Sequence, residues 1–208
     1  MFNKLMPQKK YALTVGVVLT SSIAILTTVA LNMRENDVFY NSNNSINNIL
    51  NNSDFVFGLK KIAQLEYAVG DTAVNVNQED DTYKTFENNK NFEIFLNKKS
   101  GEISSLHYTS NIESFIKSDN KHLKNVYNLT FLSISSYLFE KTSELINMMC
   151  SDSYISNKSA LISKNGFISE SIPLGKTSEI KITVIYNTDD FKNTAESVDI
   201  AILKGNKY

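Results

Sequence analysis

An uncharged, apolar stretch near the N-terminus is the strongest pattern in the chain. From Tyr11 to Met33 no residue carries a charge, and most positions are apolar. A helix of about 23 residues is about 34 Å long, slightly more than the roughly 30 Å hydrocarbon core of a bilayer. The pattern therefore predicts one membrane-spanning helix over residues 11–33, with membrane lipid as its first partner.

The charges on the two sides of this stretch predict its orientation. Three lysines lie within residues 1–10, whereas two acidic residues and one arginine lie within residues 34–37. The positive-inside rule then places the basic head 1–10 in the cytoplasm and the rest of the chain on the periplasmic or extracellular side of the inner membrane. A signal peptide cleaved after Ala30 is the alternative. The apolar stretch is, however, longer than the roughly 7–15-residue core of such peptides.

Apolar residues then recur at helical spacing between positions 46 and 69. Gly70 follows the last of them, at a point where a helix is expected to end. This predicts a helical extension or linker over residues 34–70, with a long helix, continuous or interrupted, that ends near Tyr67. The next segment, 70–91, lacks this periodicity and is predicted to be a loop.

In the C-terminal part, residues 71–208, the pattern changes to that of strands. Five segments alternate or form short apolar runs, which predicts strands at 92–97, 103–108, 126–132, 179–186 and 198–202. A helix with one apolar face is predicted over 134–149, with Ser133 or Ser135 as its cap. The predicted fold class is therefore α+β. A transmembrane helix extends into a long helix and is followed by an extracytoplasmic domain with an antiparallel sheet and an additional helix.

Overall charge and cysteine content exclude several classes of function. The net charge is -1, with 21 basic and 22 acidic residues, so no basic surface for nucleic acid is predicted. Cys150 is the single cysteine, which excludes an intrachain disulfide and a cysteine-based zinc site. We interpret Cys150 as a small apolar residue at a helix end, with an intermolecular disulfide as the alternative.

Motifs that carry chemistry in other proteins are incomplete here. Gly175-Lys176-Thr177 resembles the end of a phosphate-binding loop, but the required earlier glycine is replaced by Glu170. His107 and His122 have no partner at a metal-ligand spacing, and we interpret them as a strand residue and a surface-helix residue. The acidic segment 79–81 lacks the glycine of a calcium loop. The sequence therefore predicts no catalytic, metal or cofactor site and no enzymatic activity.

The order of the parts resembles a type IV pilin or pseudopilin, and is closest to the type IVb pilins. Residues 97–103 resemble the Asn-Pro-x-Gly-Gly turn that opens the pilin sheet, and Asn128–Ser133 is similar to the strand that leads into the helix of a type IVb head. Lys10 stands where prepilins have glycine, and no acidic residue lies in the apolar stretch. The resemblance implies a divergent minor pilin or pseudopilin of a type IV pilus or related secretion system. Its N-terminal helix would pack against other subunits, and self-association and incorporation into a pilus (a fimbrium) are further implications.

A bitopic envelope scaffold or sensor-partner protein with an extracytoplasmic α+β domain is the alternative. A pilin needs one continuous or gently kinked rod of roughly 50 residues, about 75 Å long, whereas a scaffold does not. The Asn-rich segment 41–52 disfavours such a rod, because Asn is a poor helix former. An extracytoplasmic enzyme would instead need a concave pocket with convergent polar groups.

Overall fold

The computed structural model describes residues 59, 61–77, 82–189 and 193–205. The chain divides into two compact units, 1–47 and 48–208, and all the described residues belong to the second. Among these residues no helix is long and apolar enough to cross a membrane. The predicted membrane span, the basic head and most of the predicted extension lie outside the described part of the chain.

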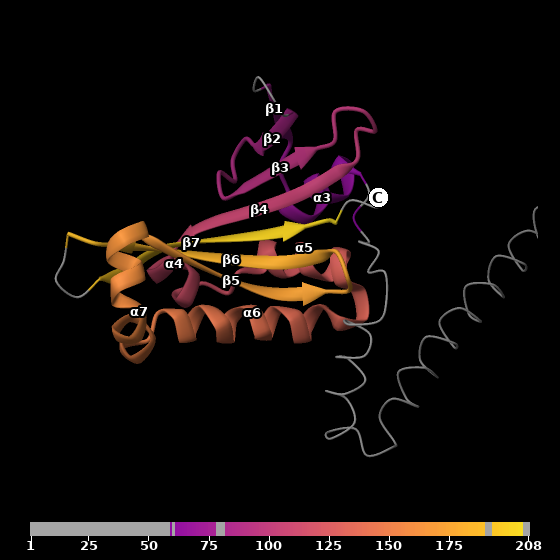
Figure 1. The fold of residues 1–208 in the computed structure, drawn as a ribbon. Helices are drawn as coiled ribbons and strands as arrows, with labels where there is room; N and C mark the ends of the chain where they lie inside the picture. Colours follow the sequence, from indigo (N-terminus) through magenta and orange to yellow (C-terminus); the bar gives the residue numbers. More distant parts are fainter. Residues whose placement is uncertain (1–58, 60, 78–81, 190–192, 206–208) are drawn as a thin grey trace, which may run out of the picture. The chain divides into compact units, whose positions relative to one another are not determined.

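One antiparallel sheet of seven strands, in the order β1-β2-β3-β4-β7-β6-β5, organises the second unit (Figure 1). The strands are β1 (Ala73–Asn77), β2 (Thr82–Phe86), β3 (Phe92–Leu96), β4 (Ile103–Asn111), β5 (Phe167–Leu174), β6 (Ser178–Asn187) and β7 (Thr194–Leu203). The first four strands form one meander and the last three form another. The final strand, β7, pairs with β4 and so joins the two meanders in the middle of the sheet. The predicted α+β class with an antiparallel sheet is confirmed.

The helices lie mostly between the two meanders in sequence. They are α3 (Ile62–Val69), α4 (Ile112–Lys117), α5 (Lys121–Phe131), α6 (Ser135–Met149) and α7 (Asp152–Asn165), with a 3-10 turn at Leu132–Ile134. The long helix α6 runs along β5 and β6 (Figure 1) and packs against both strands. Helix α5 packs against both α6 and α3, so the helices form one layer on the sheet.

The core lies between this helical layer and one face of the sheet. Along β6 alternate residues are buried, namely Ser178, Ile180, Ile182, Val184 and Tyr186. From the helices, Leu123, Leu138 and Ile146 are fully buried. Each such aliphatic side chain contributes about 1.5–3 kcal/mol of burial free energy, so these rows account for much of the driving force of folding.

Two turns form as the sequence predicts. The side-chain oxygen of Asn97 accepts hydrogen bonds from the backbone N–H groups of Lys99 (2.9 Å) and Ser100 (3.2 Å). Gly101 completes this turn between β3 and β4 with φ +67°, a conformation that glycine adopts without strain. Gly70 ends α3 with φ +76°, which confirms the predicted end of that helix.

The predicted loop at 70–91 is wrong, because β1 and β2 form there. Both strands have five residues, and within them Phe86 is the residue that is buried. Most other side chains of this hairpin are partly accessible, so the alternation of apolar and polar residues that marks a strand is short and weak here. Pairing with β3, rather than the hairpin's own pattern, stabilises these strands.

Two further expectations are corrected by helical structure. Residues 126–132 belong to α5 and the turn that follows it, because the buried residues Leu123, Val126, Tyr127 and Thr130 share one helical face. The helix predicted to end near Tyr67, continuous or interrupted, is present in the described residues as α3, and Lys61 before it has extended backbone (φ -133°, ψ 145°). Helix α6 begins at Ser135 without a side-chain cap, and neither predicted serine acts as one.

Candidate interaction surface

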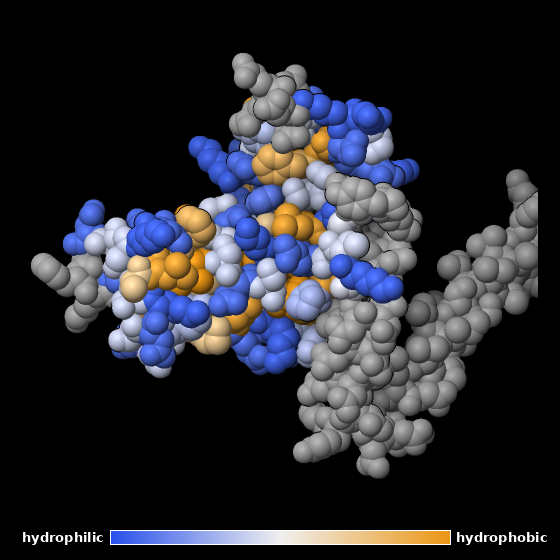
Figure 2. Space-filling view, in the orientation of Figure 1, coloured by the Kyte–Doolittle hydropathy of each residue, from blue (hydrophilic) through white to orange (hydrophobic). Residues whose placement is uncertain are grey.

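The sheet has one face covered by helices and one accessible face, which is the candidate site. On β6 the side chains between the buried ones, Lys181, Thr183 and Ile185, are accessible. The same alternation on the neighbouring strands gives an accessible row that contains Tyr83, Phe95, His107, Thr109 and Asp199. We call this side of the sheet the open face. On the side of the molecule seen in Figure 2, apolar residues form small patches separated by polar ones.

A hydrogen-bonded cluster of three residues lies at the centre of the open face. Thr109 and Asp199 are direct neighbours across β4 and β7, and the Thr109 hydroxyl donates to Asp199 Oδ1 (3.3 Å). His107 Nδ1 lies 3.4 Å from Asp199 Oδ2, and both side chains are about three-quarters covered (28% and 27% exposed). Both carboxylate oxygens are therefore engaged, and the carboxylate fixes the orientation of the imidazole.

An aromatic row continues from this cluster toward β2. The ring of His107 meets that of Phe95 edge to face with a centroid distance of 5.0 Å, and Phe95 stacks on Tyr83 at 5.3 Å. Such pairs contribute about 0.5–1.5 kcal/mol beyond their buried area. A partly apolar strip with polar groups beside it is typical of a protein-binding surface, where aromatic residues are enriched.

The contacts within the cluster are hydrogen bonds to one carboxylate. Thr109 and His107 each bond to Asp199, and the structure shows no hydrogen bond between the Thr109 hydroxyl and the His107 ring. Within the described part of the chain, no three His, Cys, Asp or Glu side chains lie close enough together to hold a metal ion.

A second polar group of residues lies where α6 meets α7, on the covered side of the sheet. Tyr154 donates a hydrogen bond to Glu170 Oε1 (2.6 Å), and Tyr186 donates to the carbonyl oxygen of Met149 (3.0 Å). Burial raises the pKa of the Cys150 thiol and raises that of Tyr186 to about 12. A thiol with a raised pKa is a poor nucleophile and a poor metal ligand at neutral pH, which agrees with a structural role for Cys150.

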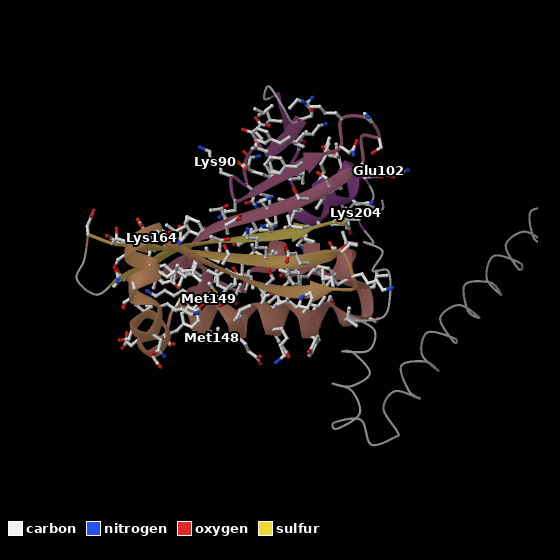
Figure 3. The ribbon with its side chains drawn as sticks, in the orientation of Figure 1. Lys90, Glu102, Met148, Met149, Lys164 and Lys204 are labelled. Carbon is white, nitrogen blue, oxygen red and sulfur yellow. The ribbon has the colours of Figure 1, made fainter. Side chains whose placement is uncertain are left out.

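Residues after β7 make polar contacts at one end of the sheet. Lys204 Nζ lies 3.7 Å from Glu102 Oε2, and the two side chains lie at the same end of the sheet in Figure 3. The backbone N–H of Gly205 donates to the hydroxyl of Ser178 (3.1 Å).

At the C-terminal end of α6, Met149 is buried whereas Met148 is 43% exposed, so successive residues of this helix face the core and solvent.

A hollow of about 350 Å³ lies on the helical layer between α5 and α6. It is lined by Lys124, Tyr127, Asn128, Ser135, Ser136, Phe139 and Glu140. Ser135 donates to Asn128 Oδ1 (2.8 Å), and Lys124 Nζ lies 5.2 Å from the centroid of the Phe139 ring. Three of its polar side chains therefore already contact other residues of the lining.

The candidate chemical groups of the sequence lie far apart in the structure. Gly175-Lys176-Thr177 forms the turn between β5 and β6, and no helix follows it. His107 lies on β4 and His122 is exposed on α5, which confirms both interpretations. Cys150 lies at the end of α6, as predicted, and the acidic segment 79–81 lies outside the described residues. The contact between His107 and Asp199 had no sequence signal, because 92 positions separate them.

The two stretches that carried the pilin resemblance lie in a turn and in helical structure. Residues 97–103 include the turn between β3 and β4, which two earlier strands of the sheet precede, and Asn128–Ser133 is helix and 3-10 turn instead of a strand. Comparisons with protein-family models, with curated proteins and with solved structures found no match to this chain.

Proposed function

We propose that this chain is a non-enzymatic, single-pass membrane subunit of an envelope assembly, pilin-like in its organisation. The observation that carries the proposal is the uncharged segment Tyr11–Met33, which lies between a basic N-terminus and the α+β domain. Under this proposal the N-terminus is cytoplasmic and the domain lies on the periplasmic or extracellular side. The N-terminal helix would pack against other subunits, as in a minor pilin or pseudopilin of a type IV pilus or secretion system.

The first described residues of the chain pack on the α+β domain. Leu59 is buried (7% exposed) and lies beside Ile103–Leu106 of β4 and Ile202 of β7. Helix α3 then packs on α5 and buries Leu65, Ala68 and Val69. Leu59 and α3 therefore belong to the packed part of the domain.

One observation favours the second candidate, a bitopic scaffold or sensor-partner protein. Lys61 is extended, so a helix that begins near Tyr11 ends before α3 and does not run into the sheet domain. A rod of about 50 residues that begins at Tyr11 would end near residue 60, so the break at Lys61 bears on whether the rod continues into the sheet domain and not on its length. A scaffold protein needs no such rod and is compatible with a break at this position.

The test is membrane fractionation and N-terminal sequencing of the full chain, from cells with and without a prepilin peptidase. Trimming within residues 1–16 that depends on the peptidase would support the pilin-like subunit, whereas an intact chain in the membrane fraction would support the scaffold. A cut after Ala30, with the protein released in soluble form, would contradict both.

Two variants test the physical basis of the membrane assignment. Ile25→Glu introduces a charge in the middle of the apolar segment, which costs several kilocalories per mole in a membrane and should shift the chain out of the alkali-resistant membrane fraction. Tyr67→Glu is the matched control, because Tyr67 is 84% exposed on α3 and tolerates a charge. Equal membrane retention of both variants would contradict the assignment.

A further inference from the structure

The two edge strands of the sheet differ in how they are protected against pairing with another strand. An edge strand exposes unpaired N–H and C=O groups, and proteins protect such edges with proline, charged residues or inward-facing charges. The edges of this sheet are β5 and β1. For each edge strand, its residue pairs with the neighbouring strand show which N–H and C=O groups point outward.

The β5 edge is protected at two positions. The Tyr186 N–H donates to the carbonyl oxygen of Gly166 (2.8 Å), so Gly166 directs its backbone groups toward β6. Successive residues of an antiparallel strand direct these groups to opposite sides. The odd-numbered residues from Phe167 to Pro173 therefore direct their N–H and C=O groups outward. Pro173 occupies one of these outward positions and lacks the N–H group that a partner would need. Glu170 places a carboxylate on the covered face of the same strand, where Tyr154 binds it.

The β1 strand itself has neither kind of protection, although the Glu66 carboxylate from α3 accepts a hydrogen bond from the outward Ala73 N–H at its start. The Glu87 N–H donates to the carbonyl oxygen of Thr72 (3.2 Å), so Thr72 directs its backbone groups toward β2. By the same alternation, Val74 and Val76 also direct theirs toward β2, whereas Asn75 directs its N–H and C=O groups outward. The strand Ala73–Asn77 contains no proline and no charge. Asn75 is exposed and Val74 is 44% exposed, and no described strand pairs with β1 on its outer side.

The sequence of β1 is complementary to itself. Asn75 lies between two valines, and a two-fold axis through Asn75 would place Val74 of one copy beside Val76 of the other on the open face. Those valines lie beside Thr85 and Tyr83, so pairing would continue the aromatic row of Tyr83 and Phe95 across the junction. With no charge on β1 and a chain net charge of -1, two copies meet without strong repulsion at this edge.

We propose that β1 pairs in antiparallel orientation with β1 of a second copy of this chain, about a two-fold axis at Asn75. Because β5 is protected, β1 cannot extend the sheet by pairing with the β5 edge of another copy, and the contact closes as a dimer. Two strands of five residues share few hydrogen bonds, and the Ala73 N–H is already bonded to Glu66 Oε1 (3.3 Å). The pairing is therefore weak in dilute solution and is promoted when copies are concentrated in one membrane.

The proposal rests on the proposed assembly function, since that function supplies the local concentration of copies. The first experiment uses the full chain with Cys150→Ser, in native membranes, treated with a mild oxidant and a short thiol cross-linker. Asn75→Cys in this background should give a cross-linked dimer, because hydrogen-bonded partners in antiparallel strands have Cα atoms about 5.5 Å apart, within disulfide range. Ser171→Cys, at an outward position of the protected β5 edge, should give none.

A second measurement tests the backbone pairing itself. We expect the full chain in detergent to form a concentration-dependent dimer in light scattering. Asn75→Pro removes the outward N–H but leaves the hydrogen bonds between β1 and β2 in place, so it should abolish this dimer. Ser171→Pro should leave the dimer unchanged, and circular dichroism shows whether each variant is folded. Cross-linking of Asn75→Cys no stronger than that of Ser171→Cys would overturn the proposal even if Asn75→Pro failed to fold.

The two proposals fail in different ways. A chain found in the membrane fraction that shows no Asn75 cross-link would overturn β1 pairing and leave the assembly function standing. A soluble chain that still cross-links in purified form at Asn75 would contradict the membrane assignment and retain the β1 dimer.

Discussion

The buried hydrogen bond between Tyr127 and Thr142 allows the energetics of the helical layer to be tested in detail. The two oxygen atoms are 2.9 Å apart, and both side chains are buried, with 0% exposure. The Thr142 hydroxyl donates its proton to the carbonyl oxygen of Leu138 (2.8 Å), so the Tyr127 phenol must be the donor in the pair. Burial raises the pKa of Tyr127, and the phenol keeps this proton at all physiological pH values.

This assignment predicts unequal effects for the two single variants. Tyr127→Phe removes the donor and leaves Thr142 bonded to Leu138, so we expect a loss of about 0.5–1.5 kcal/mol in the free energy of unfolding. Thr142→Val removes the acceptor and leaves a buried phenol without a partner, which costs about 1–3 kcal/mol. In the double variant the phenol is absent, so its loss should be smaller than the sum of the two single losses.

Urea unfolding of the full chain in a mild detergent, followed by near-UV circular dichroism, provides the measurement. The denaturation midpoint should fall more for Thr142→Val than for Tyr127→Phe, with an unchanged slope of free energy against urea concentration. Equal losses in the two single variants, or additive losses in the double variant, would refute the assigned direction of the hydrogen bond.

Three further predictions concern two backbone positions and one tyrosine that titrates. Gly205→Ala should destabilise the fold by about 1–3 kcal/mol, because an added Cβ would lie 2.2 Å from Thr177 Cβ and 2.4 Å from the Thr177 carbonyl oxygen. Adding Thr177→Ala to this variant should restore only part of the lost melting temperature, because the carbonyl oxygen remains. Leu132 has φ +49° and ψ -119° and is 68% exposed, so Leu132→Gly should relieve strain of about 1–3 kcal/mol and raise the melting temperature, whereas Leu132→Ala should not. The raised pKa of Tyr186, about 12 against its usual 10.0, predicts full stability below pH 10 and a decline from pH 10 to 12, because the unfolded chain loses the phenol proton first. This decline should be shallower in Tyr186→Phe, as measured by urea unfolding at fixed pH values.

The elements that the sequence predicts well are those whose own side chains are buried in a complete pattern. Ile180, Ile182 and Val184 alternate over a ten-residue strand with one covered face, so β6 was predictable from period alone. The five-residue strands β1 and β2 bury little besides Phe86, and their formation depends on β3, which lies further along the chain. Residues 126–132 were assigned to the wrong element because a short apolar run fits both periods. The buried face of α5 becomes clear only when Leu123 is included.

The candidate site depends on connections that local pattern does not contain. His107 and Asp199 come together because β7 pairs with β4, with Thr109 opposite Asp199. Sequence reasoning predicted that both segments are strands but had no basis for their order in the sheet. A contact between strands about 90 residues apart is set by the packing of the intervening helices on the sheet, which is a property of the whole domain.

The central position of the last strand connects the fold with the proposed assembly role. Until β7 is inserted, β4 and β6 each present an unpaired edge, and neither meander is a complete sheet. Insertion of β7 closes both edges, and the following residues fix it through Lys204 to Glu102 and Gly205 to Ser178. Because Pro173 protects β5, the completed sheet retains β1 as its one unprotected edge among the described strands. A subunit built in this way presents a single unprotected edge once β7 is in place between β4 and β6, and a single such edge favours a closed dimer over uncontrolled sheet extension.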